Sequence, residues 1–396
     1  MGIYLNPGNE AFRQAVTDEL YIDKTNLISA INKKINKSRV KHLCVSRPRR
    51  FGKSMAADML TAYYGKGCDS RKLFAGKKIE QEPSFETHLN QHNVIRLDIQ
   101  RFLFSKDHFD IFIEQIQNVV IRDLQAEYGS LFHSDSYGLP GALDQIYSHT
   151  KEGFIFIIDE WDYVFRFAKE RSDIQKAYLD FLRGLFKGAG YVKLAYMTGI
   201  LPIKKYGEHS ALNIFDEYSM VEPKELGEYF GFLEDEVQEE CKKHGVDYTE
   251  MKKWYDGYQL DNLLIYNPKS VVDALTWKKF GSYWTSTETY EALKIYIDLN
   301  FDGLKESIIQ MLGNGRCKVN PYKFQNDMTT FSTKDDILTL LIHLGYLTYD
   351  EATEEAFIPN QEIAQEFLNA IDGPGWNDII QSINYLSDLF KQFKHS

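Results

Sequence analysis

The chain has 396 residues, of which 43% are hydrophobic and 26% charged, and its formal net charge is −11. This length predicts two or three domains with a sizeable core. The acidic net charge argues against a protein that coats nucleic acid by general electrostatics, but it does not exclude a local basic groove.

The cysteines and the apolar runs indicate the compartment. Cys44, Cys68, Cys241 and Cys317 are far apart and form neither a C-x-x-C pair nor a zinc-binding spacing, which favours reduced thiols. The first residues lack the pattern of a signal peptide, and the apolar runs are much shorter than a membrane span. We therefore expect a cytoplasmic protein with no membrane partner.

A loop that ends in Gly52-Lys53-Ser54 is the most informative feature of the sequence. An apolar run, residues 42–45, precedes the loop, and a helix-forming segment, residues 55–63, follows it. Strand, loop, Gly-Lys-Ser and helix is the arrangement that holds a nucleoside triphosphate by its phosphates. Backbone N–H groups surround the phosphate oxygens, the lysine adds a cation, and the serine hydroxyl ligates Mg²⁺. The alternative is a lysine on a solvated helix start.

The loop departs from the G-x-x-x-x-G-K-[ST] pattern at one position, where Arg47 replaces the first glycine. Pro48 biases Arg47 toward an extended conformation. Arg47, Arg49 and Arg50 add charge beside the expected phosphates, and one of the three is a candidate to reach the γ-phosphate or a neighbouring subunit. The alternative is that these arginines form a solvated rim or pair with acids of the fold.

The region around this loop, residues 40–216, alternates between strand and helix patterns. Such alternation predicts an α/β fold with a mainly parallel sheet, helices on both faces and right-handed crossovers. After the first strand, strands are expected at residues 93–98, 153–158 and 192–199, and helices at residues 109–128, 140–147 and 174–186. A further helix, residues 26–32, is expected in the segment before the core.

Two acids follow the apolar run of residues 153–158, as at the carboxyl end of a buried parallel strand. Ligands bind at that edge of open α/β sheets. Asp159 is predicted to hold Mg²⁺ through a water ligand, and Glu160 to orient and deprotonate the attacking water. The alternative for this pair is a strand end that passes into a polar turn. Asp98, at the end of an earlier strand, is a further candidate for a place near the metal, with a structural role as its alternative.

Thr198 stands at the end of the strand predicted at residues 192–199. A Thr or Asn at this place in such folds can reach the γ-phosphate or the lytic water. Thr198 is therefore a candidate catalytic residue, and a threonine that satisfies local backbone groups is the alternative.

Motifs over most of the chain resemble one family. The matching segments are residues 21–25, 46–54, 158–162, 197–200, 211–213, 254–258, 266–270 and 343–349. They resemble the bacterial and archaeal AAA-ATPase-like family, whose members often carry a PD-(D/E)xK nuclease-like domain at the C-terminus. The resemblance implies a P-loop NTPase core of the AAA/RecA-like type, and it implies that the missing first glycine is normal. Because no acid–spacer–E-x-K signature is found, we expect the nuclease-like domain to be absent from this chain.

The resemblance also implies the extent of the nucleotide site. In related ATPases the segment before the first core strand lies against the adenine, so Tyr21 and Ile22 are candidates for packing on the base, with a plain edge strand as the alternative. ATP and Mg²⁺ are the expected cofactors. The expected catalytic residues are Glu160, Lys53 and Thr198, and the expected metal ligands are Ser54 and Asp159. The expected cofactor-binding residues are Tyr21, Ile22, Arg47, Pro48, Arg49, Arg50, Phe51, Gly52, Lys53, Ser54 and Met55.

After residue 216 the sequence pattern turns helical. Pro223 can start a helix, and apolar residues then recur at helical spacing, namely Leu226, Tyr229, Phe230, Leu233, Val237 and Cys241. This pattern resembles a helical lid, assigned to residues 217–290. Residues 254–258 predict a tight turn into a short hairpin.

The last part, residues 291–396, has the pattern of a winged-helix unit. Thr333, three residues before Asp336, is a plausible helix start. A helix (residues 337–343), two strands (346–349 and 356–359) and a helix (361–371) are expected. The turn between the strands, residues 350–355, is acidic and would repel phosphates, which favours an intramolecular or protein-contact role. An apolar face over residues 376–395 is predicted to pack on the preceding domain, and a partner surface or the connection to a missing domain is the alternative.

The sequence therefore predicts four parts: an N-terminal segment (1–39), a P-loop ATPase core (40–216), a helical lid (217–290) and a winged-helix-like domain (291–396). The expected function is Mg²⁺-dependent ATP hydrolysis coupled to a conformational or assembly change. The alternatives are a nucleotide-gated switch or scaffold with little turnover that controls a separate effector, and a DNA-processing motor. A homo-oligomer or an effector protein is the expected partner, and nucleic acid is not favoured.

Overall fold

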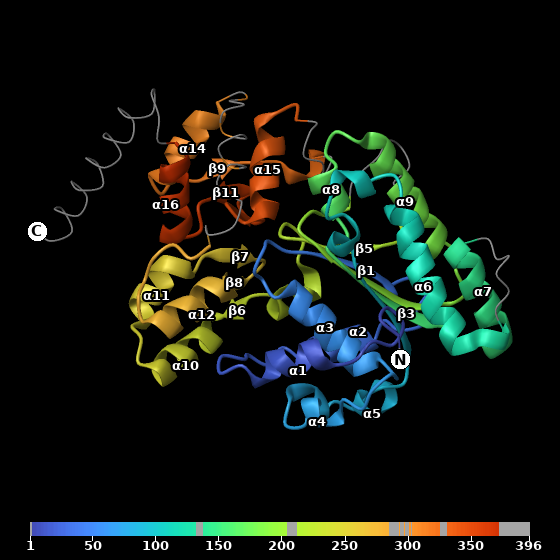
Figure 1. Cartoon of the computed structure of the whole chain (residues 1–396). Coiled ribbons are helices and arrows are strands. Elements are labelled where there is room, and N and C mark those ends of the chain that lie inside the picture. The colour runs from blue at the N-terminus through green and yellow to red at the C-terminus, as the bar shows by residue number, and fades with distance from the viewer. Residues whose placement is uncertain are drawn as a thin grey trace, which may run out of the picture. The chain divides into compact units, whose positions relative to one another are not determined.

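The computed structural model describes residues 2–131, 138–203, 212–284, 293, 297, 301, 303–324 and 331–371. Contacts within the chain divide it into two compact units (Figure 1). The first unit takes in the described residues of 1–47 and 52–219, and the second takes in those of 48–51 and 220–371. The finer division at residues 39, 216 and 290 stays a prediction.

Five strands form the sheet of the first unit, in the order β2-β3-β4-β1-β5. All of their pairings are parallel. This confirms the predicted α/β fold with a parallel sheet. The strands are β1 (His42–Ser46), β2 (Asn93–Asp98), β3 (Phe154–Asp159), β4 (Val192–Gly199) and β5 (Asp216–Tyr218). Strand β5 was not expected, because its three residues include two acids and no apolar run marks it.

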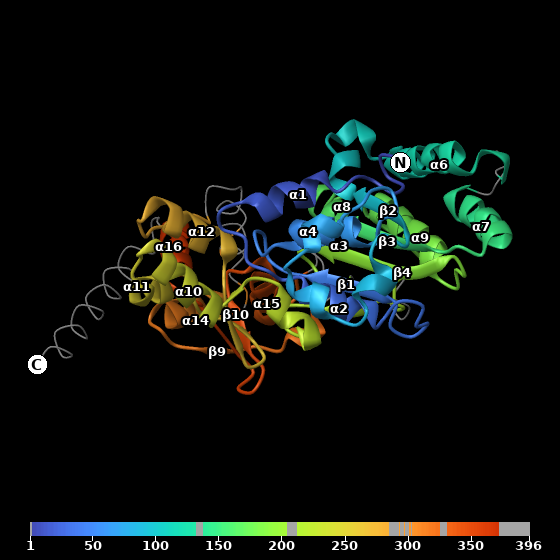
Figure 2. The same cartoon turned by 90° about the horizontal axis from the view of Figure 1, so that it is seen from below.

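Helices cover both faces of this sheet (Figures 1 and 2). On one face lies α3 (Lys53–Tyr64), which contacts β2, β3 and β4. On the other face lie α6 (Phe112–Tyr128), α7 (Gly138–Thr150) and α9 (Ser172–Phe186), which share an apolar core with alternate strand residues. The remaining helical segments are α1 (Glu10–Thr17), α2 (Asn26–Asn32), α4 (Arg71–Phe74), η1 (Lys78–Gln81), α5 (Phe85–His88), η2 (Ile99–Phe102), η3 (Lys106–His108), η4 (Gly129–Leu131) and α8 (Tyr163–Phe167).

Strand alternation decides which side chains share a face with α3. Successive strand residues point to opposite faces. Phe156 and Ile158 of β3 and Met197 of β4 lie in the core beneath α6, α7 and α9. The next residues along the two strands, Asp159 and Thr198, therefore belong to the face of α3, at the carboxyl ends of neighbouring strands.

The second unit contains two three-stranded sheets with strand orders β6-β8-β7 and β10-β11-β9, and their pairings are antiparallel. Its strands are β6 (Phe232–Leu233), β7 (Tyr258–Leu260), β8 (Leu263–Tyr266), β9 (Cys317–Lys318), β10 (Thr348–Asp350) and β11 (Glu355–Phe357). Its helical segments are η5 (Lys224–Tyr229), α10 (Glu234–His244), α11 (Tyr248–Tyr255), α12 (Pro268–Trp277), α14 (Leu304–Leu312), η6 (Pro321–Lys323), α15 (Lys334–Leu344) and α16 (Gln361–Ala370).

The expectation of one helical stripe from Pro223 to Cys241 is wrong. A 3₁₀ helix ends at Tyr229, strand β6 pairs with β8, and α10 begins only after β6. Gly231 has φ +90°, and a Cβ at this position would lie 2.1 Å from Cγ2 of Ile265. The close approach of β8 thus requires a glycine in a left-handed conformation, and this interrupts the helical pattern.

Other predictions for the second unit are confirmed. The predicted hairpin is formed by β7 and β8, directly after Gly257. Thr333 caps α15, and its hydroxyl and the Asp336 carboxylate form a reciprocal capping box. Helix α15, the strand pair β10 and β11, and α16 follow in the expected order. The winged-helix identity of this unit stays a prediction, and the apolar face expected at residues 376–395 lies outside the described residues.

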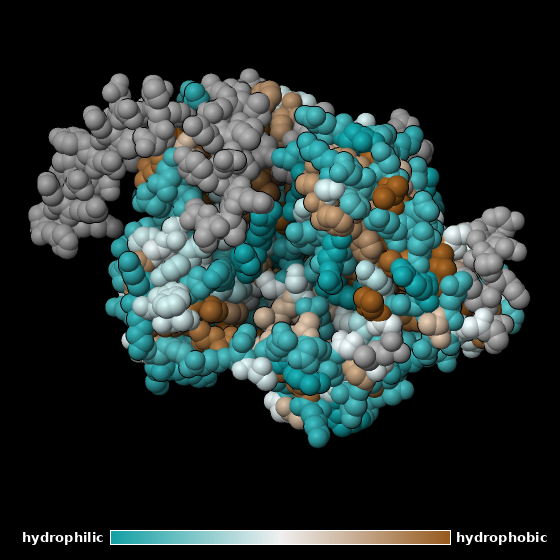
Figure 3. Space-filling view, in the orientation of Figure 1, coloured by the Kyte–Doolittle hydropathy of each residue, from teal (hydrophilic) through white to brown (hydrophobic). Residues whose placement is uncertain are grey.

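The described helices give no candidate for a membrane span, since each is too short or too polar. The face drawn in Figure 3 is largely hydrophilic, and its apolar residues lie in small separate patches.

Candidate functional site

The loop between β1 and α3 turns through two residues with positive φ, Arg50 at +69° and Gly52 at +85°. Among the described residues, none beyond its chain neighbours has an atom within 4 Å of a Cβ built on Gly52, so the backbone angle, not crowding, favours glycine here. Gly52 directly precedes Lys53, the first residue of the 12-residue helix α3. A helix N-terminus presents N–H groups without intrahelical partners and favours anions.

Arg47 is buried and is part of the sheet edge. Its Nη1 atom donates to the carbonyl oxygens of Ser46 and Tyr218, each at 2.8 Å, and so connects β1 with β5. The solvated-rim alternative is therefore wrong for Arg47. Arg49 is half-buried and Arg50 is exposed. Contact of any of these arginines with a phosphate stays a prediction.

Pro48 and Phe51, which belong to the second unit, are buried within it. The Phe51 ring meets the Tyr258 ring edge-on, with centroids 5.1 Å apart and an interplanar angle of 89°. A Cβ on Gly345 would lie 2.7 Å from Cβ of Pro48. These two loop side chains thus serve as packing groups, and their contact with a nucleotide stays a prediction.

Lys53 lies close to acids and is only 5% exposed. Burial lowers the pKa of Lys53, while the carboxylates of Glu160, Asp159 and Asp162 act in the opposite direction. A lysine on a solvated helix start, the alternative left open by the sequence, is therefore wrong. The lysine of the loop and the acids after β3 meet at one edge of the sheet.

Asp159 is held from several sides. Its Oδ2 atom accepts from Arg96 at 3.2 Å, and its Oδ1 atom accepts from the Thr198 hydroxyl. Burial alone would raise the pKa of Asp159, but the Arg96 guanidinium and hydrogen bonds from Thr198 and Ser54 outweigh it, so the pKa lies below its usual range. Arg96 also bonds Asp58 of α3 at 3.2 Å. The buried carboxylate is therefore charged and ordered.

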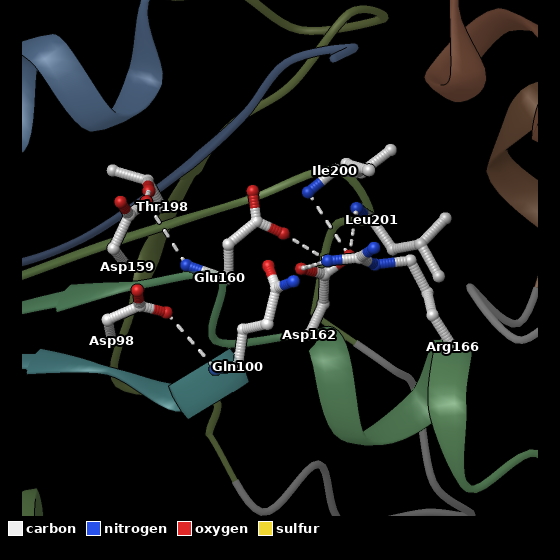
Figure 4. A network of polar contacts seen from close by, with 9 residues as sticks. All are labelled: Asp98, Gln100, Asp159, Glu160, Asp162, Arg166, Thr198, Ile200 and Leu201. Carbon is white, nitrogen blue, oxygen red and sulfur yellow. Dashed lines mark hydrogen bonds and ion pairs between the residues drawn. The ribbon is translucent and has the colours of Figure 1, made fainter. Parts of the chain in front are cut away.

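Glu160 follows with φ +51°, an unusual conformation for a residue other than glycine. Its N–H donates to Oδ1 of Asp159 at 3.1 Å, and its side chain forms an ion pair with Arg166 of α8 (Figure 4). Arg166 also bonds the fully buried Asp162. The predicted base thus lies in a short network of charged side chains.

Asp98 is at the same edge, in register with Asp159 on the neighbouring strand. Its carboxylate accepts from the N–H of Gln100 and caps the following 3₁₀ turn (Figure 4). Burial and the Asp159 charge raise the pKa of Asp98. The structure therefore gives Asp98 a structural contact, and a direct place on the metal stays a prediction.

Tyr21, Ile22 and Met55 complete the expected nucleotide-binding set. Tyr21 and Ile22 are half-buried and lie outside regular secondary structure, so the edge-strand alternative is wrong. Tyr21 packs edge-on against Phe12, and the Lys77 ammonium lies 4.6 Å from the Tyr21 ring centroid. Met55, in the first turn of α3, is 44% exposed. Their contact with adenosine stays a prediction.

The oxygen donors at this edge fit Mg²⁺. A carboxylate and two hydroxyls, those of Asp159, Ser54 and Thr198, are hard ligands of the kind that Mg²⁺ prefers, and phosphate oxygens and waters usually complete its shell. Within the part of the chain that the structure describes, no cluster of three or more His, Cys, Asp or Glu is arranged to hold a metal ion. The three oxygen ligands suit a cation whose remaining ligands come from phosphate and water.

Sequence reasoning assigned no role to four charged residues of this site: Arg96, Asp58, Arg166 and Asp162, the last of which lies in the matching segment 158–162. A signal existed for two of them. Arg96 is the one charged residue inside the otherwise apolar strand run of residues 94–97, and Arg166 stands four residues after Asp162, the spacing of neighbours on a helix.

Comparisons with known proteins found a matching family and a curated relative. The family described as "Predicted AAA-ATPase" matches residues 8–207. An uncharacterised protein from the vnfD 5′ region of Azotobacter chroococcum mcd 1 is 23% identical over 278 residues, which are 69% of this chain and 51% of that protein. The chain thus spans about half the length of this curated relative.

Two solved structures show a looser likeness. The Walker-type ATPase PABY2304 of Pyrococcus abyssi is 13% identical, with 86% of this chain and 95% of that chain covered and a TM-score of 0.43. The ORC2 protein of Aeropyrum pernix is 11% identical, with 93% and 98% covered and a TM-score of 0.39. Because both TM-scores are below 0.5, the family assignment depends on the sequence match, which takes in the phosphate loop, the acids after β3 and Thr198. The chain belongs to the AAA-ATPase-like family and is a predicted AAA-type ATPase.

Proposed function

We propose that this protein binds ATP with Mg²⁺ at the edge of the parallel sheet and hydrolyses it. One observation supports this proposal above the others: Lys53 and Ser54, at the N-terminus of α3, lie beside the paired acids Asp159 and Glu160. P-loop NTPases use this combination of a phosphate-binding helix start and a carboxylate edge for phosphoryl transfer.

Each side chain has a proposed role. Lys53 stabilises charge on the transferring phosphoryl group, Ser54 and Asp159 hold Mg²⁺ directly or through water, and Thr198 orients Asp159 and the lytic water. Bound Mg²⁺ would supply neutralisation of phosphate charge. Glu160 accepts the proton of the attacking water.

The test measures nucleotide affinity and phosphate release separately. Lys53→Ala is expected to abolish ATP affinity. Glu160→Gln is expected to keep ATP affinity and to lose about 10²–10⁴-fold in turnover, the usual contribution of a general base. A wild-type protein without affinity for ATP in the presence of Mg²⁺ would refute the proposal as a whole. Wild-type turnover in Glu160→Gln would remove Glu160 from the mechanism.

A nucleotide-gated switch with little turnover is the second candidate. This candidate requires that the ion pair with Arg166 occupies Glu160 and keeps it from acting as a base. Steady-state turnover, compared with the mass of the protein in solution with and without ATP, separates the two functions. Stimulation of turnover by DNA would instead support a DNA-processing motor.

Coupling of the nucleotide state to a conformational or assembly change is also proposed. A homo-oligomer or a separate effector protein is the proposed partner. The same measurement of mass with and without ATP tests the assembly.

A further inference from the structure

The proposed base, Glu160, has a charged neighbour that the sequence did not assign to the site. Arg166 reaches it from α8, and its side chain is only 10% exposed. The Nε atom of Arg166 bonds Oδ2 of Asp162 at 3.1 Å, while Nη2 donates to Oε2 of Glu160. The planar guanidinium group thus holds two carboxylates at fixed positions, which a single ammonium group could not do.

Asp162 fixes Arg166 to the end of β4. Its carboxylate is fully buried, and Oδ2 accepts from the N–H groups of Ile200 at 3.1 Å and Leu201 at 2.9 Å (Figure 4). A buried and fully hydrogen-bonded ion pair orients its members far better than an exposed pair. The position of Arg166 is therefore tied to the segment that directly follows Thr198.

Glu160 is constrained at its backbone as well as at its side chain. A non-glycine residue at φ +51° is strained by roughly 1–3 kcal/mol and needs surrounding contacts to persist. The N–H bond to Asp159 and the ion pair with Arg166 supply such contacts. In Figure 4 one carboxylate oxygen of Glu160 points to Arg166 and the other points away from it, an arrangement that leaves an acceptor for a water molecule.

We infer that Arg166 is a positioning residue that orients Glu160 toward the attacking water, with Asp162 as its fixed support. A catalytic base acts well when a third group orients it. This inference depends on the proposed hydrolysis, and it adds a residue outside the loop and the paired acids. Arg166 itself is not assigned a contact with the nucleotide.

The test compares steady-state kcat and KM for ATP with Mg²⁺ among full-length variants. Arg166→Met is expected to lower kcat about 10- to 100-fold, as expected for a displaced catalytic group, with KM nearly unchanged. Arg166→Lys keeps the positive charge but loses the planar guanidinium group, so it is expected to recover part of the lost kcat. Arg171→Met is the matched control, because Arg171 forms exposed ion pairs with Asp110 and Asp173. The kcat of this variant should equal that of the wild type.

A double variant separates positioning from a purely structural role. If Arg166 acts through Glu160, adding Arg166→Met to Glu160→Gln causes no further loss of kcat. A second, additive loss would overturn the inference, as would an unchanged or increased kcat in Arg166→Met.

Arg166→Met leaves two carboxylates without their cation and can fail to fold. In that case Arg166→Lys is the test, and a wild-type kcat in this variant would overturn the inference. Failure of the proposed function is distinguishable, because the wild type would then show no turnover.

Discussion

The packing around Gly199, the last residue of β4, leads to a quantitative prediction. A Cβ at this position would lie 2.6 Å from Oδ1 of Asp162 and 2.7 Å from Cδ1 of Trp161, distances that real Cβ atoms essentially never show. Neither neighbour can move easily. The Asp162 carboxylate holds the N–H groups of Ile200 and Leu201, and the Trp161 indole is fully buried. Gly199→Ala therefore introduces a methyl group for which the packed junction has no space.

The magnitude follows from the cost of overpacking. An extra methyl group in a well-packed core costs about 1–3 kcal/mol. For a unit of about 150–250 residues, each kcal/mol shifts the melting temperature by about 2–4 °C. We expect Gly199→Ala to lower the melting temperature of the first unit by about 2–12 °C, measured by calorimetry or by circular dichroism.

Gly184→Ala is the matched control for this prediction. Gly184 is exposed within α9, and in the described part of the chain nothing outside its own helical turn lies within 4 Å of a Cβ built on it. Alanine in a helix interior is favoured over glycine by about 0.5–1 kcal/mol, so this variant should melt at or above the wild-type temperature. Equal melting temperatures for the two variants would refute the packing argument for Gly199.

Three further predictions concern other parts of the molecule. Thr198→Val removes the hydroxyl donor to Asp159, so we expect about 10-fold lower kcat with little change in ATP affinity. Phosphate release and nucleotide titration measure the two quantities, and an unchanged kcat would remove Thr198 from the mechanism. Gly345→Ala drives a methyl group against Pro48 and should destabilise the second unit by about 1–3 kcal/mol in a denaturant titration, and wild-type stability would contradict this packing. Burial raises the pKa of Glu362 from its ordinary 4.5 to about 7, so the folded protein binds this proton more tightly than the unfolded chain does. The contribution of Glu362 to the free energy of unfolding therefore falls as pH rises from about 4.5 to about 7, and Glu362→Gln should flatten the measured pH dependence in this window; an identical slope in the variant would refute the assignment.

Much of the first unit could be predicted from local patterns. The apolar runs of β1 to β4 and the periodicity of α6 and α9 are strong signals, since these elements are buried on the faces that the pattern marks. Parallel strands place their carboxyl ends at one edge, which is why Lys53, Asp159 and Thr198 could be expected together before any coordinates. Their roles in ATP chemistry are still predictions.

The remaining features depend on contacts between distant segments, which a single sequence does not display. Strand β5 is three residues long and is held by β1 and by the buried Arg47, so its own residues carry no strand pattern. The break at Gly231 results from the approach of β8, a chain segment more than thirty residues later. The partners of Arg96, namely Asp58 and Asp159, likewise lie on other segments, 38 and 63 residues away along the chain.

The geometry of the acidic edge suggests how it would respond to a nucleotide. The carboxylates of Asp159 and Asp162 are already ordered by neighbouring donors, so little reorganisation of these groups is needed when charge develops during the reaction. Lys53 differs, because its ammonium group lies among the same acids, and an entering phosphate would compete with them for it. The phosphate oxygens would then neutralise part of the positive charge of Lys53. The bound cation would neutralise the acids that Lys53 had faced. We therefore expect the proposed nucleotide and Mg²⁺ to bind best together, with the acids held in place while their electrostatic partner changes.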